Sequence, residues 1–222
     1  MRLLFDLDGT LTDPGCGIAR CIQYALSGLG RPVPASTELA WCIGPPLRES
    51  LAVLLDGNDP ALVERAVALY RARFASFGMF ENEVYPGVAD ALASLRADGH
   101  QLLVVTSKPH VYARAVLRHF GLSSVFGAVY GSELSGERGD KVSLLNHVLS
   151  VEGRGEPSFM IGDRRHDIEG AHANGLQAVG VLWGYGSRAE LDAAGADDLV
   201  DSTSELVEWA GRAQSAQPGR EG

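Results

Sequence analysis

The chain has 222 residues, of which 45% are hydrophobic and 21% charged, and its formal net charge is −9. Such a length and composition indicate one medium-sized globular domain, or a domain that carries a smaller insertion. The acidic balance argues against binding to a nucleic-acid polymer or an anionic membrane, whereas a few local cations still allow a small anionic ligand. No apolar run has the length of a bilayer span and no signal-peptide pattern precedes the first apolar stretch, so we expect a cytoplasmic protein.

The predicted elements fall into two blocks along the chain. Residues 2–8 form a short apolar run that stops at Gly9, which predicts a buried strand followed by a loop. From about residue 16 to residue 80 the signals are helical, and the longest helix is predicted over residues 61–77. After residue 88 helices alternate with strands, and the strands are expected at residues 100–106, 128–131, 159–162, 178–182 and 199–200.

This order of elements predicts an α/β fold with a Rossmann-like parallel sheet covered by helices on both faces. The helical block interrupts the α/β pattern after its first strand, so we interpret it as an inserted α-helical cap domain. We place the α/β core at residues 1–14 and 84–213 and the cap at residues 15–83. The polar residues 214–222, which are rich in Gly and Pro, are expected to form a disordered tail.

Two carboxylates stand where the first predicted strand ends. Asp6 and Asp8 are two residues apart and therefore project toward the same side of the strand. Their repulsion calls for a cation, and Mg²⁺ prefers carboxylate oxygens together with substrate phosphate. One carboxylate can attack phosphorus to form an aspartyl-phosphate, while the other protonates the leaving oxygen and later activates water. A polar Asp-Gly turn explains an isolated Asp-x-Asp pair, but it explains the longer segment over residues 5–13 poorly.

Further polar residues follow other predicted strands, and ligands of an open parallel sheet bind at the carboxyl ends of its strands. Thr106 and Ser107 precede a helix, where hydroxyls and amides suit a phosphate, although a plain N-cap is the simpler interpretation. Lys141 begins a helix, where the helix dipole disfavours a cation, and this mismatch hints at phosphate binding. A solvated surface lysine is the alternative for Lys141, and Lys108 has the same status.

A last pair of carboxylates follows the strand predicted over residues 159–162. Asp163 and Asp167 are four residues apart across a strand-to-helix turn. Asp163 can reach a metal ion, and Asp167 lies in the first helical turn, where it can cap the helix or orient a metal-bound water. An N-capping aspartate with a nearby salt bridge is the ordinary alternative.

These segments together resemble the haloacid dehalogenase superfamily, on its phosphatase side, over about residues 2–206. The segment from Asp6 to Thr10 is similar to the first motif of that family, and Thr106 and Lys141 are similar to the second and third. Gly162-Asp163 with Asp167 is similar to the fourth. The detailed likeness is to phosphoglycolate-phosphatase-like proteins with a helical cap, and it rests on residues 43–47, 106–109 and 162–168.

The resemblance implies a Mg²⁺-dependent phosphatase that passes through an aspartyl-phosphate. Asp6 would be the nucleophile and a metal ligand, and Asp8 the general acid/base whose backbone carbonyl also meets the metal. Asp163 and Asp167 would complete the metal site. The catalytic set would also include Thr106 and Lys141. The phosphate-binding candidates are Gly9, Thr10, Thr106, Ser107, Lys108 and Lys141. One departure is Thr12, where many capped members carry a valine, and its hydroxyl is a candidate for altering the polarity of the pocket.

The cap is expected to recognise the part of the substrate beyond the phosphate. Arg48, which follows a proline-stiffened loop, is a candidate contact for a carboxylate or a second phosphate. Trp41 is a candidate for an apolar or base-stacking wall. A surface arginine and a cap-core tryptophan are the plain alternatives. Hinges near Pro14 and Pro86 would let the cap close over the site. The candidate substrates are phosphoglycolate, a sugar phosphate and a nucleoside monophosphate.

Three other functions share parts of this pattern. A phosphomutase of the β-phosphoglucomutase type would return the phosphoryl group to a sugar, and a silent binding or regulatory module would keep the fold without turnover. A dehalogenase needs no metal and has little use for Asp8 and Asp163. The expected partner is a small phosphorylated metabolite, with the choice between monomer and homodimer left open. No role follows from the sequence for His110 or His166.

Overall fold

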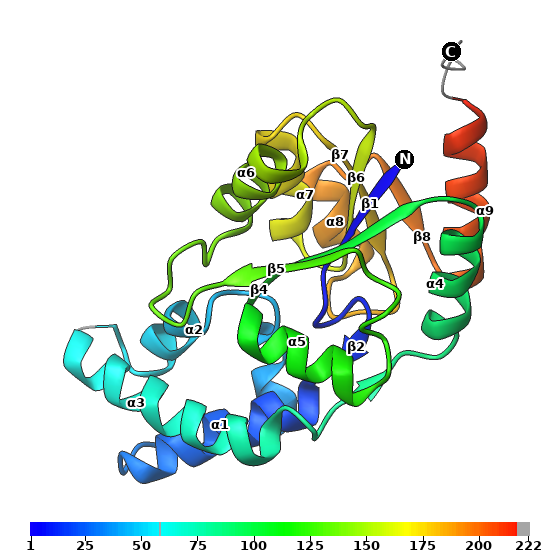
Figure 1. Ribbon diagram of the computed structural model, residues 1–222. Helices are drawn as coiled ribbons and strands as arrows, with labels where there is room; N and C mark the ends of the chain where they lie inside the picture. Colours follow the sequence, from blue (N-terminus) through cyan, green and yellow to red (C-terminus); the bar gives the residue numbers. More distant parts are fainter. Residues whose placement is uncertain (58, 217–222) are drawn as a thin grey trace.

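A parallel sheet forms the centre of the computed structural model, which describes residues 1–57 and 59–216. Its strands lie in the order β5-β4-β1-β6-β7-β8 (Figure 1), and each neighbouring pair is parallel. The predicted α/β fold is therefore confirmed. The strands are β1 (Arg2–Phe5), β4 (Gln101–Pro109), β5 (Ala128–Ser132), β6 (Ser158–Gly162), β7 (Gln177–Val181) and β8 (Asp198–Val200).

Helices cover both faces of the sheet, because successive side chains of a strand point to opposite faces. In β1, Leu3 and Phe5 belong to one buried apolar cluster, whereas Leu4 belongs to the other. The first cluster is covered by α4 (Val88–Ala97), α5 (His110–His119) and α9 (Thr203–Ser215). The second cluster is covered by α6 (Lys141–Glu152), α7 (Arg165–Ala173) and α8 (Arg188–Ala194).

Two details of the core differ from the sequence-based expectations. Helix α8 was not predicted, because it has seven residues and buries only Leu191, which leaves almost no apolar periodicity to detect. Helix α9 continues to Ser215 and so takes in the first residues of the expected tail. Residues 217–222 of that tail lie outside the described residues. Within the described ranges 1–57 and 59–216, no helix is both long and apolar enough to cross a membrane.

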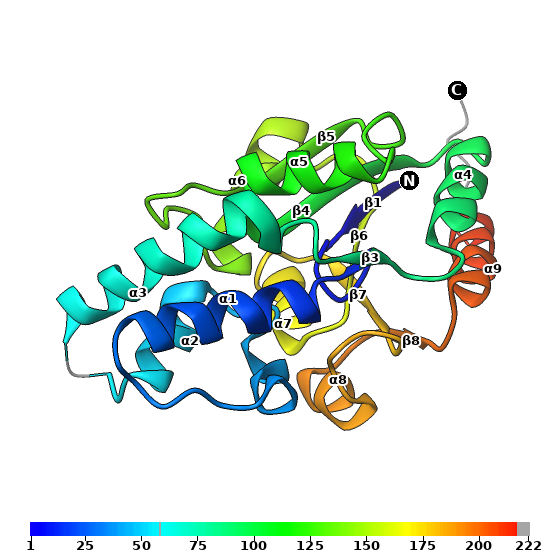
Figure 2. The same cartoon turned by 90° about the horizontal axis from the view of Figure 1, so that it is seen from below.

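The chain between β1 and α4 forms a helical cap, as predicted. It leaves the core at β2 (Thr12–Asp13) and returns at β3 (Glu83–Val84), and these two strands pair antiparallel. Figure 2 shows the cap helices grouped to one side of the sheet, away from α4 and α9. The boundaries proposed for the two domains stay a prediction. The helical elements are α1 (Gly15–Gly28), the 3-10 helix η1 (Ser36–Cys42), α2 (Leu47–Leu54), α3 (Pro60–Arg73) and the π-helical turn η2 (Phe74–Gly78).

The beginning and the end of the cap touch at two glycines. The backbone N–H of Gly17 donates to the carbonyl of Glu81 over 3.0 Å, and a Cβ atom on Gly17 would lie 2.1 Å from the carbonyl oxygen of Gly78. A Cβ atom on Gly78 would lie 2.4 Å from Cys21 Sγ. Arg73 pairs with Glu81 over 2.7 Å beside this contact. The two ends of the cap therefore pack backbone against backbone, and a larger residue at either glycine would force the two segments apart.

We predict that Gly17→Ala lowers the free energy of unfolding by about 1–3 kcal/mol, because the added methyl group meets a backbone oxygen that cannot move away. Urea unfolding of the two proteins measures the difference. Gly211→Ala is the matched control, since a Cβ atom there meets nothing within 4 Å. That change is expected to stabilise α9 by up to about 1 kcal/mol. Equal effects of the two changes would contradict the close contact.

Candidate active site

The polar residues singled out in the sequence meet at the carboxyl-terminal edge of the sheet. Asp6 follows β1, Thr106 lies in β4, Asp163 follows β6, and Lys141 starts α6 after β5. All four side chains are buried. Residues far apart in the chain thus converge because the parallel strands β1, β4 and β6 are adjacent and end at the same edge.

A cluster of three carboxylates and one ammonium group forms the deepest part of this edge. Asp6, Asp163 and Asp167 each place a carboxylate oxygen within 4.8 Å of the other two. Lys141 Nζ lies 2.7 Å from Asp167 Oδ1 and 3.2 Å from Asp6 Oδ1. The same ammonium donates a hydrogen bond to the carbonyl of Val105 over 2.9 Å. The ammonium group of Lys141 therefore pairs with two of the three buried acids of this cluster.

Burial controls the ionisation of the cluster. It raises the pKa of Asp163 well above its usual range, with the charge of Asp167 adding to the effect. Burial also raises the pKa of Asp167 to about 6, although Lys141 acts in the opposite direction. For Lys141 burial alone would lower the pKa, but the charges of Asp167 and Asp6 outweigh it and raise the pKa. Because the donors are hard oxygens with excess negative charge, the cluster suits a divalent cation such as Mg²⁺.

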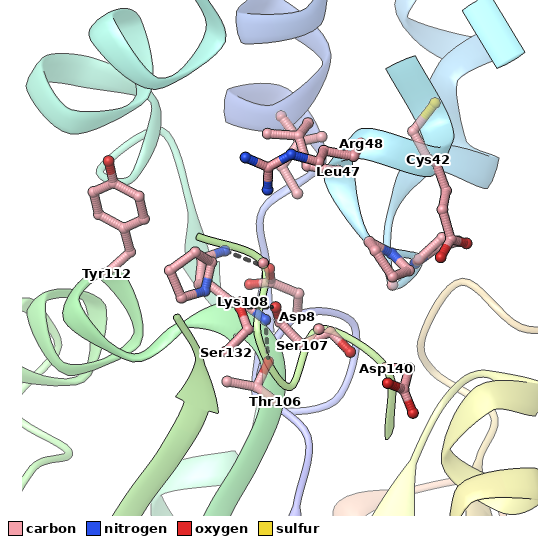
Figure 3. A pocket seen from close by; sticks show the side chains of 18 of the residues that line it. Asp8, Cys42, Leu47, Arg48, Thr106, Ser107, Lys108, Tyr112, Ser132 and Asp140 are labelled. Carbon is pink, nitrogen blue, oxygen red and sulfur yellow. Dashed lines mark hydrogen bonds and ion pairs between the residues drawn. The ribbon is translucent and has the colours of Figure 1, made fainter. Parts of the chain in front are cut away.

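Asp8 belongs to the neighbouring cavity and not to the carboxylate cluster. Its Oδ2 atom accepts a hydrogen bond from Lys108 Nζ, as Figure 3 shows. Its Oδ1 atom is buried and has no hydrogen-bond partner among residues 1–57 and 59–216. Burial raises the pKa of Asp8, and the ammonium of Lys108 opposes that shift. Lys108 Nζ also lies 5.0 Å from the centre of the Phe74 ring, which comes from the cap. Asp8 is therefore a carboxyl group placed to hold and release a proton.

The end of β4 supplies hydroxyl and backbone groups to the same cavity. The hydroxyl oxygen of Thr106 accepts a hydrogen bond from the backbone N–H of Lys108 over 3.3 Å. Ser132 donates its hydroxyl to the carbonyl of Ser107 over 2.8 Å, which holds the loop in place. Thr106, Ser107 and Ser132 all line the cavity that Asp6 also reaches (Figure 3). This arrangement can hold phosphate oxygens next to the carboxylates.

Gly9 and Thr10 lie against Asp163 instead of lining the cavity. The hydroxyl of Thr10 donates to Asp163 Oδ1 over 3.2 Å. Gly9 has a φ of 89°, and a Cβ atom there would lie 2.2 Å from Asp163 Oδ2. The structure therefore places both residues as supports of a carboxylate, where phosphate contacts were expected. Thr12 is buried and its hydroxyl accepts from the amide of Asn82 over 3.3 Å, so it does not line the cavity either.

A second loop around Asp163 was not predicted from the sequence. The backbone N–H of Tyr185 donates to Asp163 Oδ2 over 2.8 Å. A Cβ atom on Gly184 would lie 2.4 Å from Asp163 Cβ, and one on Gly186 would lie 1.8 Å from the carbonyl oxygen of Asp163. The signal that would have revealed this loop is its position, since Gly184-Tyr185-Gly186 follows the carboxyl end of β7.

A cavity of about 310 Å³ separates the cap from the sheet edge. Arg48 is among the residues that line it, but its guanidinium is paired with Glu64 over 2.6 Å. Trp41 is 40% exposed and is not among the residues that line this cavity, so its suggested role as a stacking wall stays a prediction. Arg71 and Tyr112 line the cavity and were not singled out in the sequence. The remaining cap wall is mostly apolar and consists of Ile18, Cys42, Gly44, Pro45, Pro46, Leu47 and Phe74, with Glu49 and Tyr70.

Relatives with known names match most of the chain. A protein named 5'-nucleotidase from Pseudomonas aeruginosa is 47% identical, with 86% of this chain and 87% of that protein covered. A protein named tyrosine-protein kinase PtkA from Mycobacterium tuberculosis is 40% identical, with 92% and 67% covered. A phosphoglycolate phosphatase from Pseudomonas putida is 30% identical, with 92% and 78% covered.

A solved structure and a family profile also match this chain. The crystal structure of a predicted phosphatase from Clostridium acetobutylicum superposes with a TM-score of 0.91 at 38% identity, covering 95% of this chain and 98% of that one. The sequence profile of the haloacid dehalogenase-like hydrolases matches residues 3–181. The predicted resemblance is thereby confirmed, and the chain belongs to the haloacid dehalogenase-like hydrolase family.

Proposed function

We propose that this phosphoric monoester hydrolase depends on Mg²⁺ and acts on a small phosphomonoester through an aspartyl-phosphate on Asp6. The carrying observation is the cluster of Asp6, Asp163, Asp167 and Lys141, which is buried at the sheet edge next to a cavity of substrate size. The family supports the same chemistry, and the names of two relatives, 5'-nucleotidase and phosphoglycolate phosphatase, agree with it.

Asp6, Asp163 and Asp167 are the residues that would hold the metal ion, with the backbone carbonyl of Asp8 as a further ligand. The fit rests on three carboxylates within 4.8 Å of one another, two of which pair with the ammonium group of Lys141. When bound, Mg²⁺ supplies positive charge that stabilises the phosphoryl oxygens in the transition state.

The reaction divides the work between the first two carboxylates. A carboxylate oxygen of Asp6 attacks phosphorus, the ester P–O bond breaks, and Asp8 gives its proton to the leaving oxygen. Asp8 then takes a proton from a water molecule whose oxygen attacks the phosphorus of the aspartyl-phosphate. Phosphate leaves and the Asp6 carboxylate is restored. The raised pKa of Asp8 favours the protonated form that the first step needs.

The other residues position the phosphoryl group and balance its charge. Thr106 and Ser107 offer a hydroxyl and a backbone amide at the end of β4, where the phosphoryl oxygens would lie. The positive charge of Lys141 would reduce the repulsion between the Asp6 carboxylate and the phosphate that approaches it. Phosphoryl transfer depends above all on such positioning and charge neutralisation, since the protein contributes little covalent chemistry beyond the nucleophile.

Among the candidate substrates, a nucleoside monophosphate fits the cavity best. A volume of about 310 Å³ with a mostly apolar cap wall exceeds the need of a two-carbon acid and suits a flat ring. A relative of 47% identity named 5'-nucleotidase points the same way. Phosphoglycolate and a sugar phosphate are the comparison substrates.

Transfer of the phosphoryl group to an acceptor other than water is the second candidate function. The same aspartyl-phosphate can react with a hydroxyl group, as a phosphomutase would require, and one relative carries the name of a tyrosine-protein kinase. Phosphorus NMR of the products distinguishes these outcomes, because hydrolysis releases free phosphate and transfer yields a new ester. A silent module would give neither product.

We predict that Asp6→Asn lowers kcat for every hydrolysed ester by a factor of about 10³ or more, because the nucleophile is lost. Phosphate release from nucleoside monophosphates, phosphoglycolate and sugar phosphates in Mg²⁺ measures this. Asp201→Asn changes an exposed carboxylate and serves as the control that keeps activity. Full activity of Asp6→Asn would exclude the aspartyl-phosphate.

We predict that Mg²⁺ raises the melting temperature of the wild-type protein and that Asp163→Asn removes the effect. A ligand at about 100 times its Kd stabilises the folded state by about 2.7 kcal/mol. Differential scanning calorimetry with Mg²⁺ and with EDTA measures the shift, and EDTA should also abolish phosphate release. An equal Mg²⁺ shift in both proteins would place the metal elsewhere.

We predict that Lys141→Met destabilises the metal-free protein by about 3–5 kcal/mol near pH 8, because Asp6 and Asp167 lose their buried cation. The loss should shrink toward about pH 5. A carboxyl group with a raised pKa in the folded state destabilises folding as pH rises from its unfolded pKa toward its folded pKa. Burial raises the pKa of Asp167 from its ordinary value to about 6 even with Lys141 present. The destabilisation of Lys141→Met is therefore expected to grow as the pH rises from the ordinary pKa of an aspartate through about 6 and above.

Urea unfolding in EDTA at the two pH values tests this prediction. Lys141→Arg keeps the positive charge and is the matched control. A loss of the same size at both pH values would show that packing, and not charge balance, is the contribution of Lys141.

A further inference from the structure

Arg71 is a cation of the cavity wall that no carboxylate neutralises directly among residues 1–57 and 59–216. Its guanidinium donates one hydrogen bond, to the carbonyl of Leu134 over 2.7 Å. The nearby carboxylate of Glu64 is already taken, since Arg48 binds both of its oxygens over 2.6 and 3.1 Å. Arg48 therefore occupies the nearby carboxylate, and Arg71 lines the cavity without an ion pair of its own to the described residues.

The position of Arg71 is electrostatically unfavourable without a ligand. Burial lowers the pKa of its guanidinium, and the charge of Arg48 acts in the same direction. A guanidinium carries five N–H donors and no acceptor, so several donors of Arg71 remain for a group inside the cavity. A ligand that presents hydrogen-bond acceptors to this wall would stabilise the arrangement.

The surroundings favour a neutral acceptor over a second anion. Glu49, Glu133 and Asp140 line the same cavity, together with Asp8, so a second full negative charge would meet several carboxylates. The rest of the cap wall is mostly apolar, and it suits an aromatic ring of low charge. Ring carbonyl oxygens combine these two properties.

We propose that Arg71 recognises the base of a nucleoside monophosphate by donating hydrogen bonds to the carbonyl at C6 of a purine or C4 of a pyrimidine, and that the enzyme therefore prefers hypoxanthine, guanine and uracil to adenine and cytosine. This inference rests on the proposed function. An amino group in place of the carbonyl is itself a donor, so it would face the donors of Arg71 and leave both unpaired. Arg71 thus acts as a specificity residue, remote from the reacting atoms.

The simpler alternative is a purely structural role. The hydrogen bond from Arg71 to Leu134 joins α3 of the cap to the loop after β5, and this link alone would give the residue a function. Its loss would then affect all ligands alike and would lower the melting temperature, but it would leave the ratio between two bases unchanged. The ratio is therefore the decisive quantity.

Binding to the Asp6→Asn protein in saturating Mg²⁺ tests the inference without turnover. Isothermal calorimetry compares IMP with AMP and UMP with CMP, since each pair exchanges one carbonyl for one amino group. We expect the carbonyl member to bind about 10-fold or more tightly in each pair. Adding Arg71→Gln should bring both ratios close to one, mainly by weakening IMP and UMP. Arg65→Gln, an exposed position on the same helix, should keep both ratios.

Three results would overturn the inference. They are equal weakening of all four nucleotides by Arg71→Gln, tighter binding of the amino bases, and tighter binding of 2-phosphoglycolate than of IMP that disappears with Arg71→Gln. Failure of the proposed function is seen separately, in phosphate release by the wild-type enzyme. Base-dependent binding without phosphate release would support the role of Arg71 and reject the phosphatase activity. Phosphate release with equal affinities for the two members of each nucleotide pair would support the phosphatase and reject the role of Arg71.

Discussion

The cost of burying negative charge at the sheet edge is the constraint on which the site depends. Asp6, Asp163 and Asp167 lie within reach of one another, and Lys141 is the single ammonium group that contacts two of them. Isolated carboxylates so deeply buried would become protonated and lose their use as ligands or nucleophiles. One lysine balances part of the negative charge but leaves an excess, and that excess suits the divalent cation that we propose for this site.

The backbone around the cluster is shaped by the same requirement. Asp163 accepts hydrogen bonds from Thr10 and from the N–H of Tyr185, so both of its oxygens are held. These bonds require the loops after β1 and β7 to approach closer than any side chain would permit, which explains Gly9 and Gly184 at the points of contact. A carboxylate held from two loops keeps its orientation whether or not a ligand is present, and such preorganisation would be the contribution of the core to the proposed catalysis.

Much of the carboxylate cluster could be predicted from the sequence, because the end of a buried strand can be recognised from neighbouring residues alone. The short run over residues 2–8 that stops at Gly9 identified both the strand and its carboxylates, and Lys141 stood out because the helix dipole disfavours a cation at that position. For Arg71 and Trp41 the neighbouring residues alone are not enough. Both lie in cap helices, and whether a helical side chain lines a cavity depends on how two domains pack, which the spacing within one helix does not record. The loop at Gly184 was missed because its role comes from a contact with a residue of another strand.

Cap and core meet through residues that lie next to the proposed catalytic groups. Lys108, which contacts Asp8, lies under the Phe74 ring of the cap. Arg164, next to Asp163, donates a hydrogen bond to the carbonyl of Ile43 in the cap. Arg71 reaches back from the cap to Leu134 in the core. A leaving group seated between these contacts touches both domains at once. In the function proposed here, specificity can therefore change through the cap wall while the carboxylate cluster, which core strands, loops and helices position, stays the same.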